Sequence, residues 1–169
     1  MAQTPATFSG TPYGPLAGLG QTIPEARLAV APNAIIPYGV LAMPDSGNYL
    51  FMTRGDGFPI PLDVWIGTDA YDLSGAQIWA TFKSDLLLSD AQAEIQKTLG
   101  AGIEVSTNVQ TQVDQRLTIT LVKADTDQLP NVDTYLHMDV QILPSGAVDP
   151  WTIFRDAILE VRAEVTLDS

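Results

Sequence analysis

The stretch TRGDG at residues 53–57 contains the most recognisable short motif of the chain. Its Arg54, Gly55 and Asp56 spell the tripeptide that integrins recognise on extracellular matrix proteins, so one hypothesis is cell adhesion. That recognition requires an exposed loop of an extracellular protein. Here the motif lies between two strand-like runs, YLFMT and FPIPLDV. Glycine supplies positive φ and aspartate bonds its own backbone, so we expect a turn at a strand junction.

Other residue types that could carry out catalysis are sparse. His137 is the only histidine, and the alternation TYLHMDVQ places it on the opposite strand face from Leu136 and Met138. A triad would also need a serine or threonine nucleophile and an orienting acid, and the chain has no G-x-S-x-G motif. No pair of its 20 acidic residues is marked by an apolar context that would raise one pKa. We therefore expect no catalytic residue and no enzyme, and a surface or interface role for His137.

Two groups of side chains could bind ligands. The run ADTDQLPNVD offers Asp125, Asp127, Asn131 and Asp133, oxygen donors that could bind Ca²⁺. It lacks the glycine and closing glutamate of an EF-hand, and a short helical turn capped by Asp125 explains the run without a metal. We expect no metal and no cofactor.

Three tryptophans could form a carbohydrate-binding surface. They are Trp65, Trp79 and Trp151. Tryptophans in β-sandwiches are more often core or interface residues. A carbohydrate- or host-surface-binding module remains the alternative from another functional class.

The chain is acidic, with a net charge of −12 from 8 basic and 20 acidic side chains, and it has no cysteine. Such a surface repels phosphate backbones and anionic lipids, so we expect no nucleic-acid and no membrane partner. The lack of cysteine excludes disulfides and thiolate metal sites. No basic residue precedes Arg27, which predicts no secretory signal, and no run approaches the ~18 apolar residues of a membrane span. We expect synthesis in a reducing cytoplasm, with the protein retained there or leaving in an assembly.

Composition divides the chain near residue 49. Residues 1–50 hold only three charged side chains but seven of the twelve prolines and six of the thirteen glycines. Such a segment is too broken for a long helix and too apolar for a solvated linker. We expect an extended arm at 1–48 and a β domain at 49–169. The arm packs either on its own domain or on neighbouring subunits. The side chains expected to bind partners are Ile23, Leu28, Ile35, Ile36, Tyr38 and Val40.

The second segment alternates apolar and polar residues with the period of a half-buried strand. The pattern is clear at 58–66, 77–83, 116–122 and 134–143, and weaker at 94–98, 103–107 and 109–113. Pro59 and Pro61 confine the first strand to a sheet edge, at least at its start. The GAG at 100–102 is typical of a hairpin. Short strands at regular spacing predict an all-β fold, an immunoglobulin-like antiparallel β-sandwich of about seven strands.

Two regions leave alternatives open. Ser89 followed by Gln92 fits a capping box, so 84–96 could hold a helical turn. Residues 151–167 fit both helical and strand periodicity. We favour a strand there, because a sandwich needs its final edge filled.

Four short motifs, in order, resemble the N-terminal domain of the phage baseplate upper protein family and related tail and fibre-associated proteins. They are TRGD at 53–56, DLSGA at 72–76, KADT at 123–126 and YLHMDVQ at 135–141. The resemblance covers about residues 50–168 and implies an immunoglobulin-like sandwich with a non-enzymatic role in a virion. The family domain often starts near residue 1 and precedes a long fibre or receptor-binding region, whereas here about 50 residues precede it and nothing follows.

The sequence therefore favours a bacteriophage virion protein associated with the tail, baseplate or connector. It would bind neighbouring virion subunits, including copies of itself, through its arm and sheet edges. It would be made in the bacterial cytoplasm and located in the virion. Capsid decoration, cement or head-fibre protein is the alternative within this class.

Overall fold

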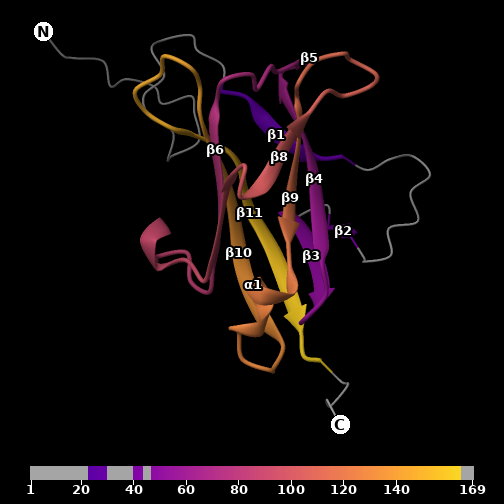
Figure 1. Ribbon diagram of the computed structural model, residues 1–169, viewed down its shortest axis with the longest axis vertical. Helices are drawn as coiled ribbons and strands as arrows, with labels where there is room; N and C mark the ends of the chain where they lie inside the picture. Colours follow the sequence, from indigo (N-terminus) through magenta and orange to yellow (C-terminus); the bar gives the residue numbers. More distant parts are fainter. Residues whose placement is uncertain (1–22, 30–39, 44–46, 165–169) are drawn as a thin grey trace, which may run out of the picture.

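The computed structural model describes residues 23–29, 40–43 and 47–164, and these form one strongly curled sheet (Figure 1). Its strands are β1 (Glu25–Leu28), β2 (Val40–Met43), β3 (Gly47–Thr53), β4 (Phe58–Ile66), β5 (Asp69–Ala70), β6 (Gln77–Lys83), β7 (Ile95–Leu99), β8 (Gly102–Ser106), β9 (Arg116–Leu121), β10 (Thr134–Leu143) and β11 (Trp151–Arg162). The helical elements are a 3₁₀ turn, η1 (Asp90–Gln92), and one turn of α-helix, α1 (Lys123–Asp127).

The strand order is β1-β4-β9-β8-β7-β6-β10-β11-β3-β2, with β5 paired to β4. The expected all-β class is confirmed. The strands form a curled half-barrel of more strands than the expected seven, and they do not separate clearly into the two layers of an immunoglobulin-like sandwich. Each strand in this order, from β1 to β2, is hydrogen-bonded to the next. The apolar face is therefore enclosed by the curling of one continuous sheet.

The core lies on the inner face of the curl and follows the predicted alternation. In β4, Phe58, Ile60, Leu62 and Val64 are buried, and β6, β9 and β10 each contribute alternate residues in the same way. Burial of each such side chain stabilises the fold by about 1.5–3 kcal/mol. The opposite face therefore displays the intervening polar and aromatic residues.

The two prolines of β4 lie where the sheet tolerates them. Val64 donates its N–H to Gln115 O at the β9 side, whereas Ala29 N–H reaches Pro61 O from the β1 side. Backbone groups of alternate residues point to opposite sides of a strand, so Pro59 and Pro61 face the β1 side. There β1 pairs only with Leu62–Trp65. The predicted edge position at the start of β4 is confirmed for the described strands.

The N-terminal segment supplies both outermost strands of the described sheet. β1 pairs antiparallel with β4, and β2 pairs antiparallel with β3. Residues on both sides of the predicted boundary at 48 thus belong to one sheet. The division of the chain into an arm and a domain stays a prediction.

The C-terminal region is the strand β11, as favoured. The reason given for it was wrong, because β11 lies inside the sheet, antiparallel to β10 and parallel to β3. The predicted turn near 84–96 is η1, and Ser89 N–H donates to Gln92 Oε1 at 3.2 Å.

The weak strand expected at 109–113 is a turn. Asn108 is buried, its Oδ1 accepts the N–H of Gln110, and Gln112 has a φ of 58°. Local side-chain bonding to the backbone competes with strand pairing at this position.

The GAG stretch lies in the tight turn between β7 and β8. Ala101 N–H donates to Thr98 O at 2.8 Å and Thr98 N–H donates to Ala101 O at 3.2 Å, and this reciprocal pair closes the hairpin that the sequence predicts. Gly102 has a φ of +91°, and a Cβ there would lie 2.5 Å from Lys97 Cδ. Lys97 cannot move freely, because its Nζ is 2.7 Å from the Asp125 carboxylate. Position 102 thus requires glycine on two grounds.

We expect Gly102→Ala to lower the free energy of unfolding by about 2–4 kcal/mol, from backbone strain plus the contact with Lys97. Gly100→Ala is the matched control, because φ is +81° there and nothing lies within 4 Å of the added Cβ. Gly100→Ala should lower the free energy of unfolding by only about 1–2 kcal/mol, from backbone strain alone. Denaturant unfolding measures both values, and equal costs would contradict the role of the contact.

Candidate functional site

The TRGD stretch forms the turn between β3 and β4. Asp56 N–H donates to Thr53 O at 3.2 Å, and Gly55 has a φ of +86°. The guanidinium of Arg54 donates through Nη2 to Asp127 O at 2.6 Å, and its Nη1 lies 4.0 Å from Glu164 Oε2. The strand-junction turn is confirmed, and Arg54 is engaged by its own chain rather than presented to a partner.

A buried hydroxyl attaches this turn to α1. Gly55 N–H donates to Thr126 Oγ1 at 2.9 Å, and Thr126 is fully buried. The same hydroxyl donates to Lys123 O at 3.2 Å. The motifs TRGD and KADT are therefore two halves of one structural contact.

The acidic run at 124–133 makes separate contacts. Asp125 Oδ2 accepts Val122 N–H at 2.6 Å, which is the predicted cap of α1. Asn131 Oδ1 accepts Glu164 N–H and Asp133 Oδ1 accepts Ala163 N–H, both at 3.0 Å. Among the described residues no three histidine or acidic side chains are grouped as metal ligands would be. The oxygens of Asn131 and Asp133 thus attach the residues after β11 to the loop before β10.

His137 is half-buried on the outer face of β10, opposite Lys83 of β6 and Ile158 of β11. The three tryptophans lie apart. Trp65 is on β4, Trp79 is on β6 with β7, β8 and β9 between them, and Trp151 packs against the core. They form no common surface for a ligand.

A side-chain cluster on the outer face of β3 and β11 had no signal in the sequence. The Tyr49 hydroxyl donates to Glu160 Oε2, and Arg162 donates to both oxygens of Glu160 at 3.3 Å. The Arg162 guanidinium carbon lies 4.4 Å from the centre of the Phe51 ring, a cation–π contact. Tyr49 and Glu160 are far apart in the chain, and only the parallel pairing of β3 with β11 brings them together.

The cluster shifts the acidity of its members. The hydrogen bond to Glu160, with a smaller contribution from burial, raises the pKa of Tyr49 to about 12. The hydrogen bonds from Tyr49 and Arg162 hold the pKa of Glu160 below its usual 4.5. Both shifts favour a neutral tyrosine beside an ionised carboxylate, which is an internal pairing of the two side chains.

The residues expected to bind partners lie partly within the described sheet. Leu28 of β1 packs against the core of its own chain, and Ile23 is half-buried. Val40 lies in β2, whereas Ile35, Ile36 and Tyr38 fall outside the described residues. Contact of these six residues with other subunits stays a prediction.

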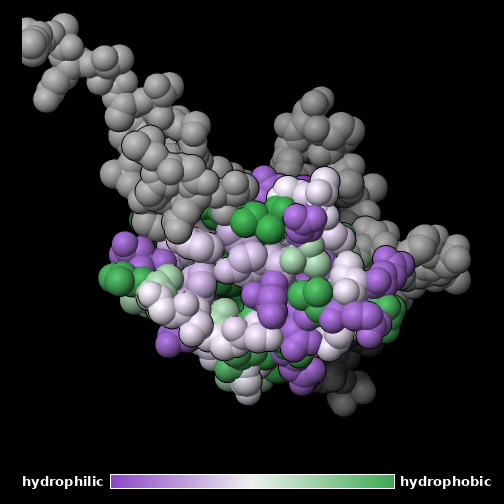
Figure 2. Space-filling model, turned by 90° about the horizontal axis from the view of Figure 1, so that it is seen from above, coloured by the Kyte–Doolittle hydropathy of each residue, from purple (hydrophilic) through white to green (hydrophobic). Residues whose placement is uncertain are grey.

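The open edges of the sheet are the surfaces best suited to a partner. In the described part of the chain, β1 and β2 each pair with a strand on one side only. Seen from above, hydrophobic side chains at the loop end of the molecule are separated by polar ones (Figure 2). Exposed backbone groups at an edge accept an added strand from another chain.

The comparisons with known proteins assign no family. No family model matches the chain, and no curated protein matches it. Among the described residues no helix has the length and hydropathy of a membrane span.

We expect Thr126→Val to lower the free energy of unfolding by about 1–3 kcal/mol, because it leaves the Gly55 N–H without an acceptor. Thr118→Val on the outer face of β9 is the control and should change stability by less than about 0.5 kcal/mol. Denaturant unfolding tests the pair. An unchanged Thr126→Val variant would show that the hydroxyl does not hold the turn.

Tyrosinate absorbance should reveal Tyr49 as a late-ionising tyrosine near pH 12, absent in Tyr49→Phe and shifted toward 10 in Glu160→Gln. The folded pKa of Tyr49 lies above its usual 10.0, so its stabilising effect is complete below pH 10 and is lost as the pH rises toward 12. The effect of Glu160 is present above pH 4.5 and is lost as the pH falls below it. A Tyr49→Phe titration identical to that of the unmodified chain would contradict the pairing.

Proposed function

We propose that the chain is a structural protein of a bacteriophage particle, associated with the tail, baseplate or connector, and has no enzymatic activity. The observation that carries the proposal is that the proline-rich N-terminal segment forms both outer strands of the described sheet. Each of these strands has a side without a partner in the described residues. Neighbouring subunits, including copies of this chain, would bind there by strand addition.

The β1 edge can be described group by group. Ala29 N–H points to β4, and alternation directs the backbone groups of Glu25 and Arg27 the same way. The N–H groups of Ala26 and Leu28 therefore face away from β4, toward the side on which β1 pairs with no described strand, and Ala26 itself is buried. The side chains of Glu25 and Arg27 form an exposed pair at 3.4 Å, so the edge carries no net charge to repel an acidic neighbour.

The motifs behind the resemblance have positions compatible with it. Residues 53–56 form the turn that leads into β4, and residues 72–76 form the turn before β6, where Ser74 N–H donates to Asp72 Oδ1 at 2.8 Å. Residues 123–126 form most of α1 after β9, and residues 135–141 lie in β10. Correspondence of the half-barrel to an immunoglobulin-like sandwich is part of this proposal, and so is location in the virion after synthesis in the bacterial cytoplasm.

Capsid decoration or a head-fibre role would use the same edges in a different place. Both locations require an edge that binds a neighbour, and they differ in which subunit provides the added strand. Cross-linking from β1 in intact particles separates them, because the linked peptide belongs to either a tail or a capsid protein.

The test uses particles made by a phage genome that encodes the chain, with mass spectrometry of purified particles as the first measurement. We expect the chain among the virion proteins, and Ala26→Pro to reduce its incorporation severalfold by removing an outward N–H, while unfolding stays cooperative. Arg27→Pro is the comparison, because it removes an inward N–H and should destabilise β1 itself.

Two outcomes would overturn parts of the proposal. Absence of the chain from purified particles would reject the virion role. Presence of Ala26→Pro at the unmodified level would reject the β1 edge as the binding surface.

A further inference from the structure

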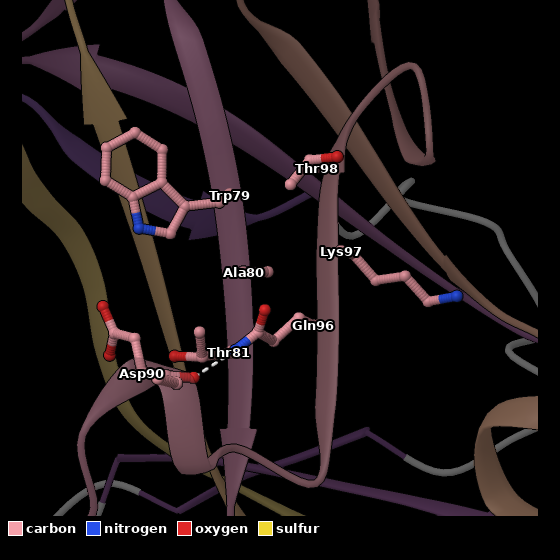
Figure 3. Close-up of a pocket in the computed structure, with 8 residues that line it drawn as sticks. Trp79, Ala80, Thr81, Asp90, Gln96, Lys97 and Thr98 are labelled. Atoms are coloured by element: carbon pink, nitrogen blue, oxygen red, sulfur yellow. Dashed lines mark hydrogen bonds between the residues drawn. The ribbon is translucent and has the colours of Figure 1, made fainter.

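A shallow pocket of about 320 Å³ opens on the outer face of the sheet, away from the open edges (Figure 3). β6, β7 and η1 form it. The side chains that matter for a ligand are Trp79, Thr81, Asp90, Gln96 and Thr98. Trp79 and Thr98 lie at one end of the pocket, and Asp90, Thr81 and Gln96 lie toward the other (Figure 3).

The acidic end is held in place by three neighbours. Lys83 Nζ lies 2.6 Å from Asp90 Oδ1, and Gln141 Nε2 donates to Asp90 Oδ2 at 3.4 Å. Gln96 Nε2 donates to the main-chain oxygen of Asp90, which fastens η1 over the sheet. The Asp90 side chain is still 43% exposed, so a fixed carboxylate faces the pocket with capacity for further hydrogen bonds.

Thr81 supplies the second observation. Its side chain lines the pocket, the residue is only 3% exposed, and its Oγ1 has no hydrogen-bond partner in the described structure. Buried hydroxyl groups in folded proteins are nearly always satisfied by protein, water or ligand. An unsatisfied one costs about 1–3 kcal/mol. The Thr81 oxygen is covered in the free chain, so a ligand hydroxyl bonds it only once the side chain has turned about χ1 toward the pocket.

The aromatic end adds an apolar surface. Trp79 is half-buried on the outer face, between Thr98 of β7 and Gln141 of β10. A partly exposed indole gives a ligand an apolar surface to pack on, and the fixed polar groups beside it orient that ligand.

The charges around the pocket indicate which class of ligand it can bind. Both lysines near the pocket are paired, Lys83 with Asp90 and Lys97 with Asp125 at 2.7 Å. The Lys97 side chain extends away from Trp79 (Figure 3). With a net charge of −12 and no unpaired cation at this site, an anionic ligand is disfavoured.

We propose that this pocket binds a neutral pyranose sugar. One face of the ring stacks on Trp79, a ring hydroxyl donates to the Asp90 carboxylate, and another bonds Thr81 once that side chain has turned toward the pocket. This would give the chain a glycan-binding activity that does not depend on the assembly role proposed above.

The test is a titration of the full chain with four neutral sugars, followed by intrinsic tryptophan fluorescence and saturation-transfer NMR. The probes are the methyl α-pyranosides of glucose, galactose and mannose, and N-acetylglucosamine, with 3′-sialyllactose as the anionic comparison. We expect saturable binding of at least one neutral sugar, weakened at least about tenfold in Trp79→Ala, or about 1.4 kcal/mol. Trp65→Ala on the outer face of β4 is the matched control and should bind as the unmodified chain does.

Thr81→Val separates a binding role from a structural one. Because the hydroxyl has no partner in the free chain, its removal should leave unfolding unchanged or raise stability, while sugar binding weakens. Loss of stability in Thr81→Val would overturn the assignment of its hydroxyl to the ligand. The pocket assignment would be overturned if no sugar of the panel binds saturably, or if binding survives Trp79→Ala. Either result leaves the incorporation experiment unaffected, since that experiment probes the β1 edge.

Discussion

The parallel pairing of β3 with β11 connects two segments that are far apart in the chain, and much of the remaining structure depends on it. Its register places Leu50 beside Leu159 and Met52 beside Val161, all buried on the inner face. Arg54 N–H extends the ladder to Arg162 O at 2.9 Å, so the following turn lies against α1 and the residues after β11. Each ladder bond adds only about 0.5–1.5 kcal/mol. Burial of the inner-face side chains adds about 1.5–3 kcal/mol each, so the apolar register decides the pairing.

This pairing also gives the N-terminal segment its place. β3 carries β2 on its far side, while β1 joins the other end of the sheet on β4. One segment therefore supplies the outermost strand at both ends of the described sheet. The outer side of each of these strands pairs with no described strand. A strand held by a few backbone bonds at an edge is suited to exchange or extension by a neighbour, which is the physical basis of the proposed assembly role.

The outer face has a different character, because polar groups on it are held by specific partners. Glu160 is fixed by Tyr49 and Arg162, and Asp90 is fixed by Lys83. The first set satisfies itself and offers nothing to a ligand. The second leaves the Asp90 carboxylate partly exposed beside Trp79 and an unpartnered Thr81 hydroxyl. That contrast is why we place a ligand at one cluster and a purely structural role at the other.

Local chemistry in the sequence determined the all-β class, most strand positions, the turn at TRGDG and the cap of α1. Each of these depends on alternation or on hydrogen bonds between residues close in the chain. Local patterns failed at 109–113, where Asn108 bonds its own loop. Tertiary structure alone decided that β11 is an interior strand, that Thr126 holds Gly55, and that Trp79 shares a pocket with Asp90. Those contacts join distant segments, and their geometry follows from the curl and register of the whole sheet, which no short window of sequence encodes.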